Sequence, residues 1–301
     1  MKPDLSLDFC GIKLKNPIMT ASGTCGHGLE LSEFFPVEEL GAISVKGMTL
    51  APREGNATPR IAETTAGMLN SVGLQNPGAD HFIEYELPGL KVKGVTVIAN
   101  ISGDTIDDYA KLAAKLDAAG VDMIELNISC PNVSHGGLAF GTDADVVYEL
   151  TKTVKSVTKV PIIVKLSPNV TDVVSIAKAA EKGGADALSL INTLLGMKID
   201  IKTRKPVLAR KVGGFSGPAI KPVAVRMVWQ VTGAVNIPVI GMGGIMTAED
   251  VVEFLLAGAK AVMVGTATLI EPDAAYTILH DLERYMEENG IADLSEFKRV
   301  D

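Results

Sequence analysis

The chain has 301 residues, of which 47% are hydrophobic and 21% are charged, and three are cysteines. This apolar fraction is typical of a globular protein and excludes disorder over any large part of the chain. The 28 basic and 36 acidic residues give a net charge of −8. That charge argues against nucleic acid as a partner, because binding along a phosphate backbone needs a basic face.

No run approaches the roughly 20 apolar residues of a membrane span, and the chain starts in a polar segment without an apolar signal core. The few cysteines suit a reducing compartment and cannot form a disulfide framework or an iron–sulfur site, which usually takes four thiolates. The four histidines are scattered, whereas zinc needs three or four well-placed ligands. We therefore expect a cytoplasmic protein without a membrane partner or a metal.

Short β-branched runs alternate with helical patterns along the chain. Several runs are continuously apolar, as parallel strands covered on both faces are. Eight strands alternating with helices predict an α/β fold, a single (β/α)8 TIM barrel over residues 1–301, with a hairpin at 5–15 closing its bottom. The predicted strands are 17–22, 42–46, 95–101, 123–129, 162–166, 187–192, 239–241 and 261–264. The predicted helices are 104–119, 143–157, 171–182, 218–232, 247–257 and 272–288.

The ends of these helices carry capping signals. An acidic residue, Asp104, is expected to cap the first helix. Glycine, which a left-handed C-cap prefers, follows four of the helices closely, at Gly120, Gly183, Gly233 and Gly258.

Two connections are longer than compact domains usually contain. Residues 49–78 follow the second strand and residues 197–217 follow the sixth. Loops of this length are often lids or binding loops. Both leave the carboxyl ends of strands, where barrel enzymes place their chemistry, so we expect them to cover a site there.

Glycines follow the last two strands. Gly243 and Gly244 end the seventh strand, and Gly265 and Thr266 end the eighth. Loops in these two barrel positions often bind phosphate through bare backbone N–H groups. Tight turns also favour glycine, but the signal in both loops favours a phosphate site.

Two lysines lie inside apolar strands, Lys46 and Lys165. A buried ammonium is costly unless paired, so each is expected to point into the barrel mouth and meet an anion. A Schiff base, a phosphate contact and stabilisation of an anionic cofactor ring all remain open as roles. So does a structural role, with the charged end of the side chain reaching water.

Asparagines are expected to end three strands at equivalent barrel positions, Asn100, Asn127 and Asn192, and Asn70 lies in the first long loop. Amides are poor strand formers, yet they offer donors and acceptors to a planar lactam or imide. Three of them favour a polar heterocyclic ligand over simple capping.

Cys130 follows Asn127 at the tip of the fourth strand. A thiol there can act as a base or nucleophile, whereas most cysteines are inert small hydrophobic residues. Its position ahead of a glycine-bearing loop favours the chemical role.

Several motifs follow one another along the chain: Ala21-Ser22-Gly23-Thr24, Val45-Lys46-Gly47, NSVGLQNPG at 70–78, NISCPN at 127–132, Ile191-Asn192-Thr193, GGFSGP at 213–218 and the glycines after the last two strands. Together they resemble the dihydroorotate dehydrogenase family over nearly the whole chain. That family consists of flavin-dependent barrels that oxidise dihydroorotate to orotate in pyrimidine biosynthesis.

The loop at 135–141 resembles class 1B of that family, whose catalytic chain works with an electron-transfer subunit. Class 1A, a fumarate-using homodimer, shares the cysteine and is the main rival. Class 2 enzymes are membrane-bound, use a serine base and carry an N-terminal extension, so Cys130 and the abrupt start argue against them. One departure from class 1B is Cys25-Gly26-His27, where aromatic residues are more usual.

The resemblance implies a role for individual residues, with Cys130 as the catalytic base. The residues expected to hold FMN are Ser22, Lys46, Gly47, Asn100, Asn127, Lys165, Ile191, Gly217, Gly243, Gly244, Gly265 and Thr266. The residues expected to hold the substrate are Lys46, Asn70, Ser71, Val72, Gly73, Leu74, Asn127, Asn192 and Thr193.

The resemblance also implies a partner subunit that carries FAD and a [2Fe–2S] cluster and passes electrons to NAD, around a homodimeric core of this chain in a heterotetramer. The residues alone leave one rival from a different class, an aldolase barrel. It would use Lys165 as a Schiff base and the glycine loops for a substrate phosphate.

Overall fold

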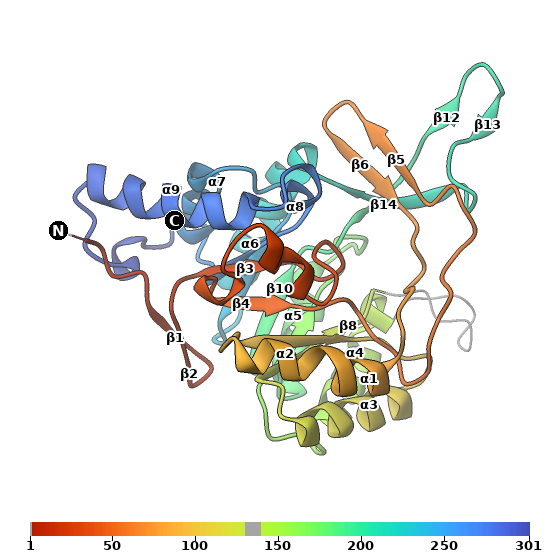
Figure 1. Ribbon diagram of the computed structural model, residues 1–301, viewed down its shortest axis with the longest axis horizontal. Coiled ribbons are helices and arrows are strands. Elements are labelled where there is room, and N and C mark those ends of the chain that lie inside the picture. Colours follow the sequence, from red (N-terminus) through yellow and green to blue (C-terminus); the bar gives the residue numbers. More distant parts are fainter. Residues whose placement is uncertain (1, 130–139) are drawn as a thin grey trace.

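Eight parallel strands close into a barrel in the computed structural model, which describes residues 2–129 and 140–301 (Figure 1). Every predicted barrel strand is present, and the predicted TIM-barrel fold is confirmed. The strands are β3 (Ile18–Thr20), β4 (Ala42–Ser44), β7 (Val97–Ile101), β8 (Met123–Asn127), β9 (Ile162–Lys165), β10 (Ala187–Leu190), β15 (Val239–Met242) and β16 (Ala261–Val264).

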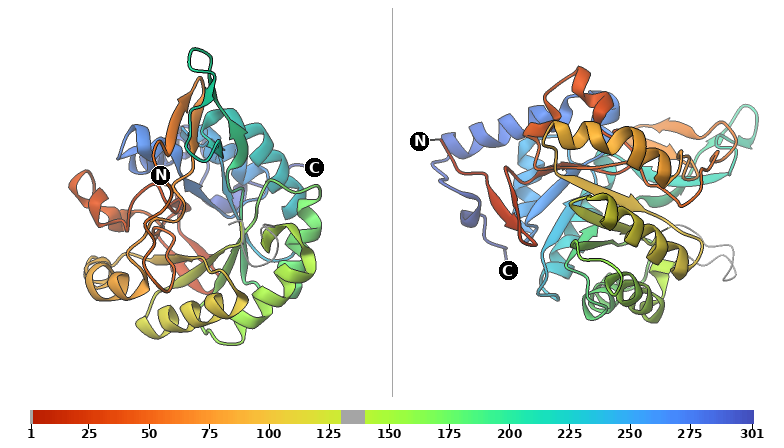
Figure 2. Two further views of the ribbon diagram at one scale, coloured as in Figure 1. Left: turned by 90° about the vertical axis from the view of Figure 1, so that its right-hand side faces the viewer. Right: turned by 60° about the horizontal axis from the view of Figure 1, so that its bottom comes forward.

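Helices surround this barrel (Figure 2). The six predicted helices are present, and each is shorter than predicted because its ends are caps or short turns. They are α3 (Ile106–Ala119), α4 (Ala144–Lys155), α5 (Val173–Lys182), α6 (Lys221–Thr232), α7 (Ala248–Leu256) and α9 (Ala274–Glu288). Three further α-helices among the described residues were not predicted: α1 (Ala79–His81), α2 (Leu87–Val92) and α8 (Thr266–Ile270).

The capping predictions were partly wrong. Thr105, not Asp104, caps α3, because its hydroxyl accepts from the Asp108 N–H while the Asp108 carboxylate accepts from the Thr105 N–H. Gly120 and Gly258 are left-handed as predicted, with φ of +86° and +98°. The other two glycines are right-handed, Gly183 with φ −70° and Gly233 with φ −82°.

A hairpin of β1 (Leu7–Phe9) and β2 (Ile12–Leu14) closes the amino-terminal end of the barrel, as predicted. Its turn is left-handed at Cys10 and Gly11. Phe9 and Leu14 are buried and pack against the lowest side chains inside the barrel.

The two long connections are not irregular loops, because they pair with one another. The first connection supplies β5 (Ile61–Thr64) and β6 (Gly67–Asn70), and the second supplies β14 (Val212–Ser216) beside β11 (Leu194–Met197). The four strands form an antiparallel sheet, β11-β14-β6-β5, that projects from the carboxyl end of the barrel (Figure 1).

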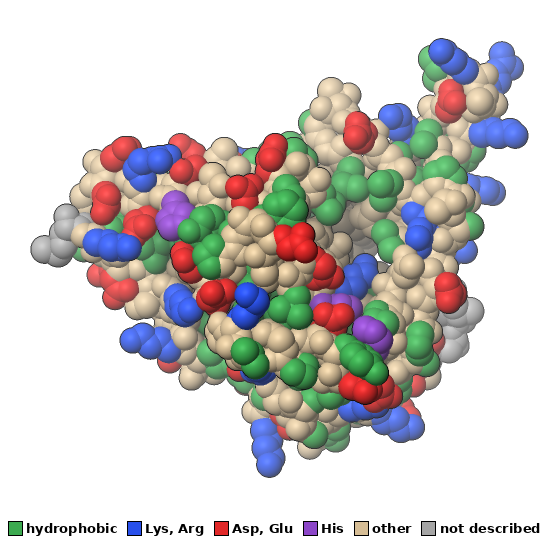
Figure 3. Space-filling view, in the orientation of Figure 1, with side chains coloured by type: hydrophobic (Ala, Val, Ile, Leu, Met, Phe, Trp, Pro, Cys, Tyr) green, Lys and Arg blue, Asp and Glu red, His purple; other side chains and the backbone are tan. Residues whose placement is uncertain are grey.

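A second hairpin extends beyond this sheet, made of β12 (Ile199–Asp200) and β13 (Lys205–Pro206). Basic side chains gather at its tip (Figure 3). Lys202, Arg204 and Lys205 are all exposed there.

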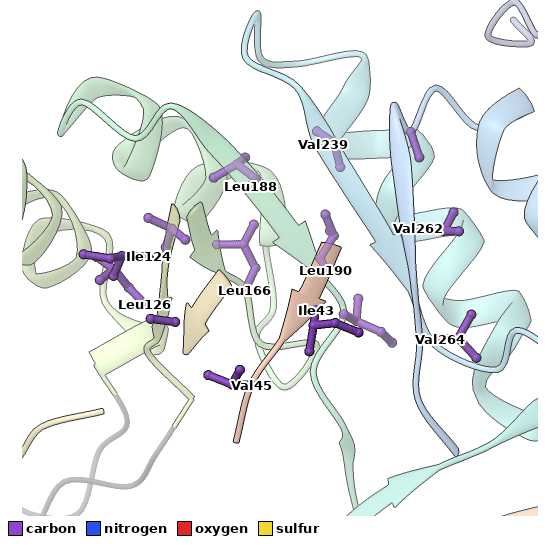
Figure 4. Packing of buried hydrophobic residues seen from close by; sticks show 14 of the residues in the cluster. Ile43, Val45, Ile124, Leu126, Leu166, Leu188, Leu190, Val239, Val262 and Val264 are labelled. Carbon is purple, nitrogen blue, oxygen red and sulfur yellow. The ribbon is translucent and has the colours of Figure 1, made fainter. Parts of the chain in front are cut away.

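Side chains of the barrel strands alternate between two buried environments. Outward-facing residues such as Ile124, Leu126 and Leu188 pack beneath the helices (Figure 4). Inward-facing residues form layers, because successive side chains of a strand point to opposite faces. The lowest layer is apolar and consists of Met19, Ala42, Ile98, Met123, Ile163, Ala187, Ile240 and Ala261. The next layer is partly polar and consists of Ala21, Ser44, Asn100, Glu125, Lys165, Ser189, Met242 and Met263.

Candidate active site

A cavity of about 1700 Å³ opens at the carboxyl ends of the barrel strands, beneath the projecting sheet. Each described residue that the motifs assign to FMN or to substrate lines this one cavity. Cys130 and most of the 135–141 loop lie outside the described residues. The cavity exceeds the roughly 300–1,000 Å³ of a pocket for one small ligand, so it has room for a cofactor and a substrate together.

The base of the cavity rests on the polar layer inside the barrel. Its central residue is Glu125, which is fully buried on β8. Its Oε1 accepts a hydrogen bond from Ser189 Oγ at 2.7 Å. Its Oε2 accepts from Asn100 Nδ2 at 2.5 Å and from Ser44 Oγ at 3.4 Å. Neutral donors from three different strands thus hold one carboxylate.

Lys165 completes this layer. Its side chain is 6% exposed, and its Nζ lies 3.7 Å from Glu125 Oε2. The prediction that Lys165 meets an anion is therefore confirmed. Lys46 lies in the same cavity wall, and its backbone N–H is bonded to the Gly26 carbonyl.

The three strand asparagines do not occupy equivalent positions, which corrects the prediction. Asn100 lies within β7 and belongs to the Glu125 layer, whereas Asn127 ends β8 one layer higher. Asn192 follows the end of β10, and its Nδ2 donates to Asn127 Oδ1 at 3.3 Å. Two amides therefore meet at the mouth, and the third lies beneath them.

The glycine loops present bare backbone to the cavity. Gly244 has φ +83°, and a Cβ there would come within 2.8 Å of Lys221 Cβ and 2.9 Å of the Gly217 carbonyl oxygen. Across the same part of the wall, Thr266 Oγ1 donates to Ser216 Oγ at 2.9 Å. Such backbone N–H groups can bind a phosphate.

Residues 70–74 enter the wall from the first long connection, and Asn76 holds that connection in place. Its Oδ1 accepts from the N–H groups of Thr49 and Gly78 at 3.2 and 2.9 Å. Its Nδ2 donates to the Leu74 carbonyl at 2.7 Å and to Thr49 Oγ1 at 3.0 Å. One buried amide therefore ties both ends of the connection together.

Two residues of this site were missed from the sequence, Glu125 and Asn76. Glu125 is an acid in an otherwise apolar strand and stands two residues before Asn127, so the two-residue period of a strand places both on the inner face. The sequence therefore contained enough information to predict that Glu125 points into the barrel. Asn76 lies within the NSVGLQNPG motif, but its anchoring role was not predicted, because its partner Thr49 lies 27 residues away.

Burial makes the two described cysteines poor bases. Burial raises the pKa of Cys25 to about 11 and that of Cys10 to about 12. Cys25 Sγ donates to Thr20 Oγ1 at 3.3 Å, beside the barrel wall. Neither cysteine lines the cavity.

His27 packs away from the cavity. Its ring lies 5.4 Å from the ring of Phe82, and its Nδ1 is 3.9 Å from Glu86 Oε1. Burial lowers the pKa of His27 below its usual value of 6.5. The unusual Cys25-Gly26-His27 segment thus packs between the barrel and the helical segment at 79–92.

Within residues 2–129 and 140–301, no three His, Cys, Asp or Glu side chains come together as a metal site. Across the same residues, no helix has both the length and the apolar character to cross a bilayer.

Comparison with known proteins agrees with this geometry. The dihydroorotate dehydrogenase family model matches residues 4–286. A protein from Alkaliphilus metalliredigens is 59% identical over 297 residues, which are 99% of this chain and 98% of that protein. Relatives from Geotalea uraniireducens and Listeria monocytogenes are 57% and 55% identical, each over 98% of this chain and 97% of the relative. All three are named dihydroorotate dehydrogenase B (NAD(+)), catalytic subunit. The chain belongs to the dihydroorotate dehydrogenase family.

Proposed function

We propose that this chain, as one barrel domain over residues 1–301, oxidises (S)-dihydroorotate to orotate with FMN as its cofactor and Cys130 as its base. The observation that carries the proposal is the single cavity. The cavity has the Lys165 ammonium and asparagine amides at its base and glycine-rich backbone at its far wall. Motifs from widely separated parts of the sequence all contribute residues to it.

The residues present fit FMN. Asn100 Oδ1 is a buried acceptor at the base of the cavity, with no hydrogen-bond donor among the described residues. Lys165 places a nearly buried positive charge in the same wall. A flavin ring carries both an N–H donor and an edge that becomes negative on reduction, and a nearby positive charge favours the reduced form. Its phosphate would take the backbone of Gly243, Gly244, Gly265 and Thr266.

The reaction removes a proton from C5 and a hydride from C6 of dihydroorotate. FMN, when bound, accepts the hydride. The chain supplies the rest: Asn127 and Asn192 would bind the lactam edges of the substrate, and Lys46 would bind its carboxylate. The segment at 70–74 would cover the substrate and exclude water.

Cys130 would take the C5 proton as a thiolate. A free thiol has a pKa near 8.5, so only a few per cent is ionised at pH 7, and kcat is expected to rise with pH as a single-base limb. Cys130→Ser, with a far weaker base, is expected to lower turnover about 100-fold or more, while FMN stays bound. Full activity of this variant at pH 7 would contradict the assignment.

The electrons then need an acceptor. We infer a partner subunit with FAD and a [2Fe–2S] cluster and NAD as the final acceptor. The words NAD(+) and catalytic subunit in the names of the relatives support this over a fumarate-dependent enzyme. Exposed apolar side chains lie at both edges of the projecting sheet, Ile61 on β5 and Leu195 and Met197 on β11. The homodimer at the core of this assembly is inferred from the family resemblance.

A purified chain tests the proposal. It is expected to be yellow with a flavin spectrum and to reduce an artificial dye with dihydroorotate, but to reduce NAD only with the co-purified partner. A colourless chain that takes up no added FMN would overturn the proposal, and borohydride trapping of a substrate on Lys165 would favour an aldolase instead. Efficient NAD reduction by the lone chain would rule out the partner.

A further inference from the structure

Glu125 has no place in the chemistry described so far. It does not line the cavity, and its side chain has no exposed surface. A buried carboxylate is costly unless its oxygens are paired and hydrogen-bonded. Glu125 satisfies its oxygens with Ser44, Asn100, Ser189 and the Lys165 ammonium, which come from four different strands.

The first consequence concerns the Asn100 amide. A carboxylate only accepts hydrogen bonds, so Asn100 must turn its NH₂ toward Glu125. Its carbonyl oxygen then points the other way, beside Gly47, where an added Cβ would lie 2.6 Å from it. Glu125 thereby fixes which atom of Asn100 faces a ligand, and that atom is an acceptor.

The second consequence concerns the Lys165 ammonium. At 3.7 Å its Nζ is ion-paired with Glu125 but beyond hydrogen-bond distance. Across residues 2–129 and 140–301, no group accepts a hydrogen bond from it. Its N–H donors thus remain for a ligand in the cavity, while the ion pair with the carboxylate behind it fixes where the ammonium lies.

We propose that Glu125 is a positioning residue that orients the Asn100 carbonyl into the cavity and holds the Lys165 ammonium beneath the ligand. The ligand it serves is a planar heterocycle with an N–H donor and an edge on which negative charge develops. This inference rests on the proposed function, because FMN is the ligand of that chemistry.

A double-mutant cycle on thermal stability tests the ion pair in the chain as purified. Lys165→Met leaves Glu125 as a buried unpaired charge and is expected to lower Tm by roughly 5 °C or more. Adding Glu125→Gln to that variant is expected to recover at least half of the loss, because Gln keeps the volume and an acceptor without the charge. Simple additivity of the two Tm losses would overturn the inference.

A second measurement detects positioning, which a merely structural role would not change. The contribution of Lys165 to the preference for reduced over oxidised FMN is the factor by which Lys165→Met lowers that preference. This factor is expected to be at least fivefold smaller in the Glu125→Gln background than in the wild type, because the ammonium has lost the carboxylate that holds it. The other charged side chains of the cavity wall stay unchanged in all four chains: Lys46, Arg53, Glu63, Asp104, Arg210 and Lys211.

Thr151→Ala is the matched control, because Thr151 is fully buried on α4 and donates to the Val147 carbonyl, outside the barrel. It is expected to lower Tm without changing the preference for reduced over oxidised FMN. An equal contribution of Lys165 in the wild-type and Glu125→Gln backgrounds would overturn the inference while FMN binding by the wild type stands. If Glu125→Gln alone cannot be purified, the Tm comparison of Lys165→Met with the double variant decides. A wild-type chain that binds no FMN overturns the proposed function and this inference with it.

Discussion

Gly47 allows the Asn100 side chain to lie against the main chain at the base of the cavity. A methyl group at this position would approach Asn100 Oδ1 to 2.6 Å, closer than a Cβ can lie to an oxygen. Asn100 cannot turn away without giving up its hydrogen bond to Glu125. The conflict therefore falls on the Asn100 carbonyl oxygen, the atom that we propose to face the ligand.

Gly47→Ala is accordingly expected to weaken FMN binding by about tenfold or more, the cost of roughly one lost hydrogen bond to a buried group. Titration of the flavin fluorescence measures it. Gly233→Ala is the control, because a Cβ there would approach the Arg299 guanidinium, and neither residue lines the cavity. Equal FMN affinity in the wild type and Gly47→Ala would show that Asn100 does not face the flavin.

His27 makes the stability of the fold depend on pH. Burial lowers its pKa in the folded chain below 6.5, whereas the unfolded chain keeps a pKa of about 6.5. Between these two values the unfolded chain binds a proton that the folded chain does not. Stability is therefore full above about pH 6.5 and is lost as the pH falls through that value toward the lowered pKa.

His27→Phe removes this titration and keeps an aromatic ring against Phe82. The loss of Tm between pH 7.5 and pH 5.5 is expected to be smaller in the variant than in the wild type, as measured by thermal melts at both values. His280→Asn, an exposed histidine on α9, controls for removal of an imidazole. Parallel curves for the wild type and His27→Phe would contradict the role of burial.

Among the elements, the connection at 49–78 depends on a single side chain. Asn76 uses both its oxygen and its nitrogen to join Thr49, Leu74 and Gly78. Asn76→Asp would place an oxygen opposite the Leu74 carbonyl, so two acceptors would face each other. The segment at 70–74, which we propose to cover the substrate, would then lose its anchor, while the strands proposed to bind FMN would remain.

Asn76→Asp is expected to raise KM for dihydroorotate about tenfold, the effect of roughly 1.4 kcal/mol, and to leave FMN affinity within about twofold. Dye-coupled kinetics and flavin titration measure the two quantities. The matched control is Asn16→Asp, since Asn16 also holds two N–H groups and one carbonyl, at the opposite end of the barrel. If both variants raised KM equally, the rise would result from a general loss of stability and not from the loss of the Asn76 anchor.

The sequence predicted the barrel elements because each depends on local patterns. Apolar runs and helical patterns predicted all eight barrel strands and six of the α-helices, and the hairpin within 5–15 was also predicted. The projecting sheet was not predictable in this way, because β6 and β14 pair across more than a hundred residues. A strand made of Val212-Gly213-Gly214-Phe215-Ser216 also has little local strand propensity.

The same distinction between local sequence patterns and long-range contacts applies to the residues of the site. Glycines, lysines and asparagines at strand ends could be read from the sequence, since the barrel brings all strand ends to one face. The sequence did not show to which layer inside the barrel each of these residues belongs. For that reason Asn100 was wrongly predicted to occupy a position equivalent to those of Asn127 and Asn192. The two-residue period within β8 would have indicated Glu125, but its partners Ser44 and Ser189 required the closed barrel.

At the scale of the whole molecule, charge is distributed unevenly. The chain carries a net charge of −8, yet the cavity wall contains five basic and two acidic side chains. One of the basic residues, Arg53, is paired with Asp104 at 2.5 Å. Arg210 and Lys211 are exposed at the mouth, where the second long connection returns to the barrel. A cationic mouth on an anionic protein attracts an anionic substrate locally.

Arg210→Gln/Lys211→Gln is therefore expected to lower kcat/KM for dihydroorotate about threefold to tenfold at low ionic strength, with kcat unchanged. The difference from the wild type should shrink at about 1 M salt, where the Debye length is only about 3 Å. Lys202→Gln/Arg204→Gln removes the same charge from the tip of the β12–β13 hairpin, outside the cavity wall. Because that tip lies farther from the path of the substrate, this control is expected to lose less than half as much. Equal losses in the two variants would mean that net charge, and not the mouth, governs the encounter with substrate.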